Sequence, residues 1–424
     1  MAGSGSPGSG VLFFPRLLQL WSTAALACLL LTVTAARASA QTEEADPGDS
    51  AKFRVGALRF TPTITLTNLG VDTNVFNAPD NPQRDTTAAI GPAVNLWLKA
   101  GRSRLSGKVS GQYLYFNNFD SQRSWGTSDE GKWEVPLGRV TPFLTGSYVD
   151  TRQRNGYEID AYARQRNTSV GLGSDLMFGG KTTVSVSGKH DTIKFDEKES
   201  FDGVVLAPAL NRASDTEQLQ VRYKLTPLTT FVVAAQGVQD RFEFEPVRDA
   251  DSIRVLPGFE FKPFALISGS VAVGYRWFNP QERVVPAYQG LIAAVDAKYT
   301  ISATQFAVKF NRDLTYSYQT TEPYYTLTDF GLTATERLTT TWDLVGRAGW
   351  QSLAYQQFAL AADIAPTDHV DHGRQYGAGF GYRLAHTVRF GFDAIYYART
   401  SQVDATRNYN GLRYGFSISY GLQP

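Results

Sequence analysis

Apolar and polar residues alternate along most of this chain, from about residue 53 to its end. In the segment 218–225, Leu219, Val221 and Tyr223 share one parity, and Gln, Arg and Lys occupy the positions between them. The same alternation recurs at 105–115, 169–178, 253–262, 375–384 and 388–396. Because successive side chains of a β-strand point to opposite faces, a period of two predicts an all-β fold. Each strand would have one apolar face and one polar face.

The connections between these segments alternate in length. Short turns occur at 100–102, 136–138, 179–181, 226–228, 262–264, 302–303 and 385–386. Longer polar loops lie between them, near 74–85, 118–129, 152–160, 196–213, 245–250, 279–287, 319–323, 355–370 and 401–408. A soluble β-sandwich also alternates, but its turns need not differ in length on the two sides. The layout predicts a transmembrane antiparallel up-and-down β-barrel of about eighteen strands, with sixteen as the alternative.

The first forty residues predict a secretory signal peptide. Arg16 precedes an apolar run over 17–36, and Ala38-Ser39-Ala40 has the form of a cleavage site before Gln41. A membrane anchor is the alternative, which the polar segment after Gln41 disfavours. We therefore expect a signal peptide at 1–40, a flexible periplasmic leader at 41–52 and the outer-membrane barrel at 53–424. Cys28, the only cysteine, lies inside the apolar run, so the mature chain would have no thiol chemistry.

Composition narrows the classes of partner. Lys plus Arg numbers 41 and Asp plus Glu 40, and this balance argues against a nucleic-acid partner. Beyond residue 40 no run of about 18 apolar residues occurs, so no membrane helix is expected there. Gly179-Gly180-Lys181 lacks the spacing of a phosphate-binding loop, and we expect no cofactor and passive transport. Aromatic residues near predicted strand ends indicate contact with outer-membrane lipid and lipopolysaccharide.

The last predicted strand has the pattern of an assembly signal. Arg413, Gly415, Ile418 and Tyr420 fit a run of polar, glycine and two apolar positions. This run resembles the carboxy-terminal signal that the barrel-assembly machinery reads, although Gly421 and three further residues follow it. An ordinary amphipathic strand is the alternative interpretation.

The polar faces of the later strands have more basic than acidic residues. The acidic residues on these faces are Glu260, Asp296, Asp313, Asp343 and Asp393. The basic candidates for the lumen are Arg222, Lys224, Arg254, Arg276, Lys298, Lys309, Arg347, Arg383, Arg389 and Arg413, with Lys262 and Arg399 beside them. A surplus of one sign in a confined channel attracts the opposite ion, so an anion-leaning pore is one reading. In the other reading, the lumen charges pair with one another and only keep the lumen hydrated.

Catalysis and metal binding have little support. The four histidines are His190, His369, His372 and His386, and none precedes a serine by two positions, so we expect no enzyme. The cluster 368–372 contains His369, Asp371 and His372, which are ligand types for a divalent metal. Neighbouring residues of one loop seldom surround a metal without distant partners, so a solvated external loop is the favoured reading. Loop 196–213 carries an apolar Val-Val-Leu-Ala-Pro stretch and could fold into the channel or lie across its mouth.

Residues 60–76 read FTPTITLTNLGVDTNVF. This segment resembles the first strand of the outer-membrane β-barrel porin family called β-barrel porin 2, many members of which accompany exopolysaccharide export genes. The resemblance implies passive passage of small solutes or of exopolysaccharide, with polysaccharide export proteins as partners. A closed structural or docking barrel of such an apparatus is the alternative function, and a barrel hydrolase is a third.

Overall fold

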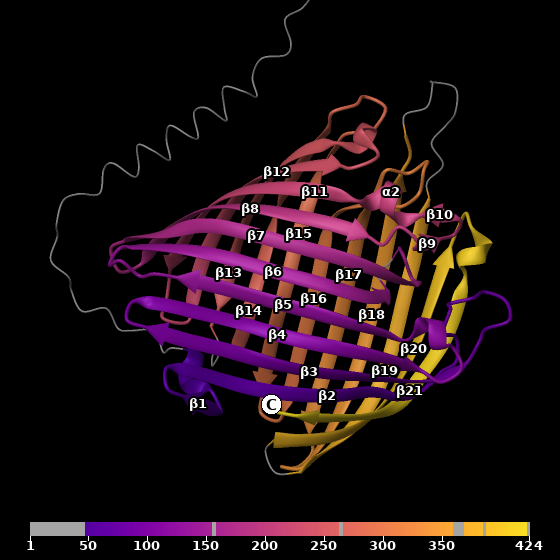
Figure 1. The fold of residues 1–424 in the computed structure, drawn as a ribbon, viewed down its shortest axis with the longest axis horizontal. Coiled ribbons are helices and arrows are strands. Elements are labelled where there is room, and N and C mark those ends of the chain that lie inside the picture. The colour runs from indigo at the N-terminus through magenta and orange to yellow at the C-terminus, as the bar shows by residue number, and fades with distance from the viewer. Residues whose placement is uncertain (1–46, 155–157, 263–265, 359–368, 385–386, 422–424) are drawn as a thin grey trace, which may run out of the picture. The chain divides into compact units, whose positions relative to one another are not determined.

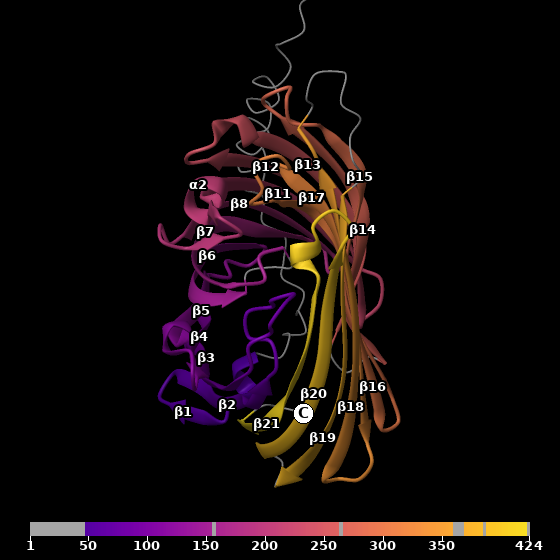
Figure 2. The same cartoon turned by 90° about the vertical axis from the view of Figure 1, so that its right-hand side faces the viewer.

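The computed structural model describes residues 47–154, 158–262, 266–358, 369–384 and 387–421. The predicted signal peptide and the leader up to residue 46 lie outside the described residues. Eighteen long strands form one closed antiparallel barrel (Figures 1 and 2). Its strands are β2 (Leu58–Asp72), β3 (Asp85–Ala100), β4 (Ser103–Phe116), β5 (Ser124–Glu134), β6 (Val140–Arg154), β7 (Tyr162–Phe178), β8 (Thr182–Phe195), β11 (Arg212–Lys224), β12 (Thr229–Phe242), β13 (Ala250–Phe261), β14 (Ile267–Pro280), β15 (Tyr288–Ile301), β16 (Thr304–Tyr316), β17 (Tyr324–Arg337), β18 (Trp342–Gln356), β19 (Val370–Leu384), β20 (Val388–Ser401) and β21 (Tyr409–Tyr420).

Each barrel strand pairs with the next one along the chain, and β21 pairs with β2 to close the ring. The predicted fold class and the count of eighteen strands are confirmed, and sixteen is wrong. Closure leaves no edge strand with unpaired backbone groups, which is the condition for a sheet to cross a bilayer.

The closing seam depends on a close backbone approach. The register of β2 against β21 shifts between Leu66 and Leu69, where Asn68 adopts a φ of 53°. A Cβ atom at Gly70 would lie 2.0 Å from the carbonyl oxygen of Tyr414. Only glycine fits this approach, so Gly70 lets the first and last strands pair despite the bulge.

The remaining short elements are not among the eighteen barrel strands. They are η1 (Pro47–Ser50), β1 (Phe53–Val55), η2 (Asp120–Gln122), β9 (Ser200–Phe201), β10 (Val204–Val205), α2 (Leu206–Leu210), η3 (Pro246–Arg248) and η5 (Ala405–Arg407). β1 folds back onto the start of β2, where Phe53 stacks on Phe60. None of the described helices has the length and apolar character needed to cross a membrane.

The two faces of the wall differ as the alternation predicts. Large apolar side chains of one parity are exposed on the outside, where lipid would cover them; examples are Leu172, Leu291 and Phe416. Strands alternating apolar-out and polar-in are the pattern of a transmembrane barrel. The other parity points inward and carries glycine, amide and charged side chains. The inward face therefore supplies every candidate for solute contact.

Two sequence predictions about connections need correction. The loop predicted at 118–129 ends earlier, because β5 begins at Ser124. A short turn between Arg337 and Trp342 was not predicted, because its Leu338 continues the apolar pattern. Parts of the predicted turns at 262–264 and 385–386, and of the loop at 355–370, lie outside the described residues. The other described connections follow the predicted alternation of short turns and long loops.

Candidate functional site

Loops from opposite sides of the barrel meet over one end, which we call the mouth. Going round the ring, the β6–β7 loop and the β16–β17 loop are eight strands apart one way and ten the other. Yet Glu158 of the first loop accepts hydrogen bonds from Ser317 and Tyr318 of the second. Such contacts can form only across the lumen. The described residues 158–161, 196–211 and 317–323 together form what we call the loop plug.

An apolar cluster holds the β8–β11 part of the loop plug. Leu206 and Leu210 of α2 are 0% and 4% exposed. They belong to one buried cluster with Phe242, Phe278 and Tyr318. Full burial of a leucine contributes roughly 1.5–3 kcal/mol, so this loop has a well-defined buried position. Leu206 and Ala207 of the apolar stretch thus pack against barrel and loop residues, whereas Val205 is exposed.

Glu158 links three segments of the chain. Its carboxylate accepts from the Ser317 hydroxyl at 2.6 Å and from the Tyr318 amide at 3.1 Å. Its main-chain carbonyl accepts from Arg399 Nη1 at 3.0 Å and Arg407 Nη2 at 2.9 Å. Burial raises the pKa of Glu158 to about 7, although the hydrogen bond from Ser317 and the charge of Arg407 act in the opposite direction. The group therefore titrates near neutral pH.

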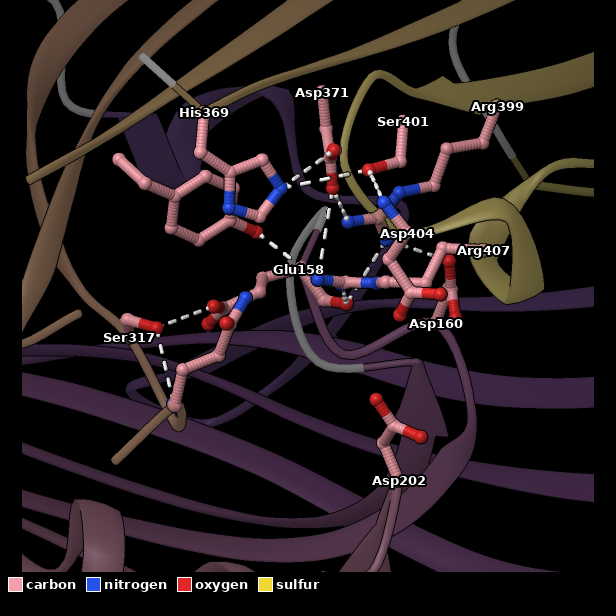
Figure 3. Close-up of polar contacts among 12 residues, drawn as sticks. Glu158, Asp160, Asp202, Ser317, His369, Asp371, Arg399, Ser401, Asp404 and Arg407 are labelled. Atoms are coloured by element: carbon pink, nitrogen blue, oxygen red, sulfur yellow. Dashed lines mark hydrogen bonds and ion pairs between the residues drawn. The ribbon is translucent and has the colours of Figure 1, made fainter. Parts of the chain in front are cut away.

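The two arginines share the carboxylate of Asp371 (Figure 3). Arg399 of β20 contacts Asp160 at 2.7 Å and also pairs with Asp371 of β19. Arg407 of η5 lies 3.5 Å from the same Asp371 carboxylate. The side chains of Arg399, Arg407 and Asp371 are at most 6% exposed. Buried charges of this kind are tolerated only when they are paired, so the network fixes the loop plug to the wall.

A second carboxylate pair surrounds His369. Its Nδ1 lies 2.9 Å from Glu322 Oε1 and its Nε2 lies 3.1 Å from Asp371 Oδ1. Burial alone would lower the pKa of His369, but hydrogen bonds to Asp371 and Glu322 raise it to about 9. The ring also stacks on Tyr355, with centroids 4.3 Å apart. At neutral pH an imidazolium therefore lies between two carboxylates.

The prediction that 368–372 form a solvated loop is wrong for His369 and Asp371. His369 is 5% exposed and Asp371 is 0% exposed, because both face the loop plug. His372 is exposed and lies on the other parity of β19. Among the described residues, no three His, Cys, Asp or Glu side chains form a group that could hold a metal ion. The structure therefore brings His369 and Asp371 together but leaves His372 apart from them.

Most of the predicted lumen cations form ion pairs. Asp313 contacts Arg254 at 3.4 Å and Arg276 at 2.9 Å, and Asp343 contacts Arg383 at 3.0 Å and Arg389 at 2.6 Å. The remaining pairs are Arg222–Glu260 at 3.6 Å, Lys309–Asp296 at 3.8 Å, Arg347–Asp393 at 2.6 Å and Arg413–Asp72 at 2.8 Å. In the described part of the chain, the side chains of Lys224 and Lys298 have no acidic partner.

The sequence count of lumen acids was incomplete. Asp240 of β12 accepts from the buried Tyr316 hydroxyl at 2.9 Å, and Asp329 of β17 lies opposite the inward Asn311. Asp72, which binds Arg413, was also absent from the count, because it ends the first barrel strand, 341 residues earlier. The basic surplus is therefore smaller than twelve against five.

The sequence also did not reveal the residues that form the buried hydrogen-bond and ion-pair network at the loop plug. Glu158, Asp160, Glu322 and Arg407 occupy loops that appear polar, and no local spacing distinguishes them from solvated residues. One signal was available: Ile159 lies between two acids and is 3% exposed in the apolar cluster. An apolar residue inside a charged loop indicates that the loop turns inward.

Four other predicted positions have simple surroundings. His190 is exposed on the apolar parity of β8 and lies 2.6 Å from Asp215 of the neighbouring strand. Gly415, Ile418 and Tyr420 lie on β21, opposite Gly70, Leu66 and Ile64 of β2. Their role as an assembly signal stays a prediction.

Several solved structures share this architecture at low identity. The glucuronate complex of Pseudomonas aeruginosa OccK2 (OpdF) is 10% identical, with 85% of this chain and 97% of that chain covered and a TM-score of 0.46. Pseudomonas aeruginosa OpdK with vanillate is 7% identical, with 86% and 98% covered and a TM-score of 0.45. A BenF-like porin from Pseudomonas fluorescens Pf-5 is 10% identical, with 86% and 99% covered and a TM-score of 0.44. Nothing about cargo follows from similarity at this level.

No curated protein matches this chain. The family resemblance seen at residues 60–76 is confirmed over almost the whole barrel, because residues 46–420 match one family. That family is described as "Putative beta-barrel porin 2", and this chain belongs to it as a porin-like β-barrel of the outer membrane.

Proposed function

We propose that this barrel is a gated porin that passes small anionic solutes across the outer membrane by diffusion. The observation that carries the proposal is the loop plug, which spans the mouth above a lumen lined with charged side chains. A plug made of the chain's own loops can leave the lumen without unfolding any barrel strand. Gating by loops of this kind is an ordinary mode of conformational control.

The charge of the lumen supports anions as the cargo. Asp313 and Asp343 each pair with two arginines, so each of these clusters retains one positive charge. Lys224 and Lys298, near the ends of their strands at the short turns, add two cations that have no acidic partner among the described residues. Fixed charges near low-dielectric walls act more strongly on an ion than they do in bulk water.

Exopolysaccharide is the second candidate cargo, and a closed docking barrel is the alternative function. A polymer needs a continuous passage of even width, and loops that meet across the mouth favour small solutes instead. A docking barrel would conduct nothing in any state. Electrical recording therefore separates the docking barrel from the two transport functions.

The test is the reversal potential of the purified protein in a planar bilayer under a salt gradient. We expect anion preference, and we expect Lys224→Gln combined with Lys298→Gln to reduce it. The matched control is Arg164→Gln combined with Arg166→Gln, which removes two charges from the outward parity of β7. Cation preference in the unmodified protein, or an equal effect of both double variants, would overturn the proposal.

A further inference from the structure

We infer that a cavity between the loop plug and the strands β18–β21 binds one small hydroxylated monocarboxylate. This inference rests on the proposed function and names the class of solute. The cavity has a volume of about 220 Å³. Tyr397, Arg399 and Arg413 line its wall side, and Asn77 and Arg154 line the opposite side.

The cavity lies where a solute would pass. Its wall is the inward parity of four neighbouring strands, and its other side is made of residues next to or within the inward loops. Gly373 of β19 keeps this wall open, because a Cβ atom there would lie 2.6 Å from Gln351 Oε1.

Arg154 is a cation of the cavity that the surrounding acids do not pair with. Three carboxylates, Asp72, Asp160 and Asp371, contact the other guanidinium groups of the region, which belong to Arg399, Arg407 and Arg413. Arg154 has no ion pair with an acidic side chain among the described residues, although Asp72 lies near enough to feel its charge. Arg154 therefore adds an unpaired positive charge to the cavity, and a solute with a single carboxylate can pair with it.

Neighbouring groups hold this guanidinium in place. Arg154 Nη2 donates to the carbonyl of Val75 at 2.8 Å, and the group lies 4.9 Å from the centre of the Tyr162 ring. Its Nε is buried and has no hydrogen-bond partner in the described structure. A carboxylate in the cavity would pair with this guanidinium, and hydrogen bonds between ions are the strong ones.

Asn77 supplies the complementary acceptor. Its side chain is 7% exposed, and its Nδ2 donates to the carbonyl of Asp160 at 3.1 Å. Its Oδ1 is buried without a donor in the described structure. The Tyr397 hydroxyl and the Gln351 and Gln375 amides supply hydrogen-bonding groups around the cavity. A solute with one carboxylate and several hydroxyl groups matches this lining.

The test is isothermal titration calorimetry of the refolded protein with gluconate, and with glucose as the neutral probe of similar size. We expect gluconate to bind and glucose to bind at least tenfold more weakly. Arg154→Gln should weaken gluconate binding at least tenfold. Arg166→Gln is the matched control, because it removes a charge from the outward parity of β7, outside the cavity, and it should change binding less than twofold.

Heat-dependent migration on SDS gels would reveal whether Arg154→Gln fails to fold. A second variant tests the site in that case. Gln375→Glu keeps the side-chain size on the wall strand and should also weaken gluconate binding at least tenfold. No gluconate binding, equal binding of glucose, or equal affinity in the folded variants would overturn the inference. Anion preference without gluconate binding would overturn the site alone, whereas cation preference would overturn the proposed function.

Discussion

At the residue scale, shared carboxylates organise the lumen. Asp343 is 1% exposed and holds both Arg383 and Arg389, which come from two different strands. The alternation places all three side chains on the inward face, and the sequence analysis found that face. Their pairing could not be predicted, because it depends on the register between strands about 40 residues apart along the chain.

We expect Asp343→Asn to destabilise the barrel by about 1–3 kcal/mol, because two neighbouring guanidinium groups lose their shared counter-charge. The matched control is Asp296→Asn. Asp296 is 61% exposed and lies 3.8 Å from Lys309, so its loss should cost less than about 0.5 kcal/mol. The free energy of unfolding in urea, measured in lipid vesicles, checks both values. Equal effects would mean that the Asp343 cluster contributes no more than an exposed pair.

At the scale of elements, the loop plug is the part that sequence reasoning recovered least. The apolar stretch at 204–208 indicated that one loop could turn inward, and Leu206 is indeed buried. The partners of Glu158 lie 159 and 160 residues away in the β16–β17 loop. Local patterns carry no information on which loops meet, because that depends on the number of strands and on closure of the ring.

We expect the loop plug to loosen as the pH rises. The pKa of Glu158 is raised from the ordinary 4.5 to about 7, so closure takes up a proton. The stabilisation is fully present below about pH 4.5 and is lost as the pH rises to about 7, a change of roughly 3 kcal/mol. His369 acts in the same direction, because its raised pKa of about 9 means that its contribution is lost as the pH rises from 6.5 through 9. Open probability in bilayer recordings should therefore increase between pH 5 and pH 9.

Glu158→Gln separates the two groups. The amide does not titrate, so the rise in open probability between pH 5 and pH 7 should disappear while the rise that belongs to His369 remains. An unchanged pH profile in this variant would mean that Glu158 does not control the loop plug.

We expect Leu206→Ala to open the mouth without unfolding the barrel. Leu206 is 0% exposed in the apolar cluster, and removing a buried leucine side chain typically costs about 2–5 kcal/mol. The lost packing energy stabilises a loop and not a barrel strand. The barrel should therefore keep its heat-dependent migration on SDS gels while its conductance rises. The control is Leu228→Ala in a short turn, where the side chain is 44% exposed. If Leu206→Ala conducts no better than this control, the β8–β11 loop does not limit passage.

At the scale of the whole molecule, the sequence was most informative. The period of two and the alternation of short and long connections were sufficient to predict eighteen strands, because each barrel strand must repeat the same inside and outside pattern. The start of β5 was placed too late, since Trp125 is the only large apolar residue between Ser124 and Lys132 and the rest resembles a polar loop. The closing seam at Gly70 was not visible locally, because it depends on Tyr414 at the other end of the chain.

The orientation of the barrel gives a direct prediction. Cysteine at Ser200, in the β8–β11 loop, should react with an impermeant maleimide on intact cells, because long loops face outside. Cysteine at Gly180, in the short β7–β8 turn, should react only after the outer membrane is permeabilised. The reverse pattern would invert the topology.

The most direct test of a gated, anion-leaning porin is the current through the purified protein in a planar bilayer at pH 8.5 under a salt gradient. We expect discrete conductance steps whose reversal potential indicates anion preference. A reversal potential of the opposite sign would contradict the lumen charge that we assign, and a bilayer that stays silent from pH 5 to pH 9 would contradict passage altogether.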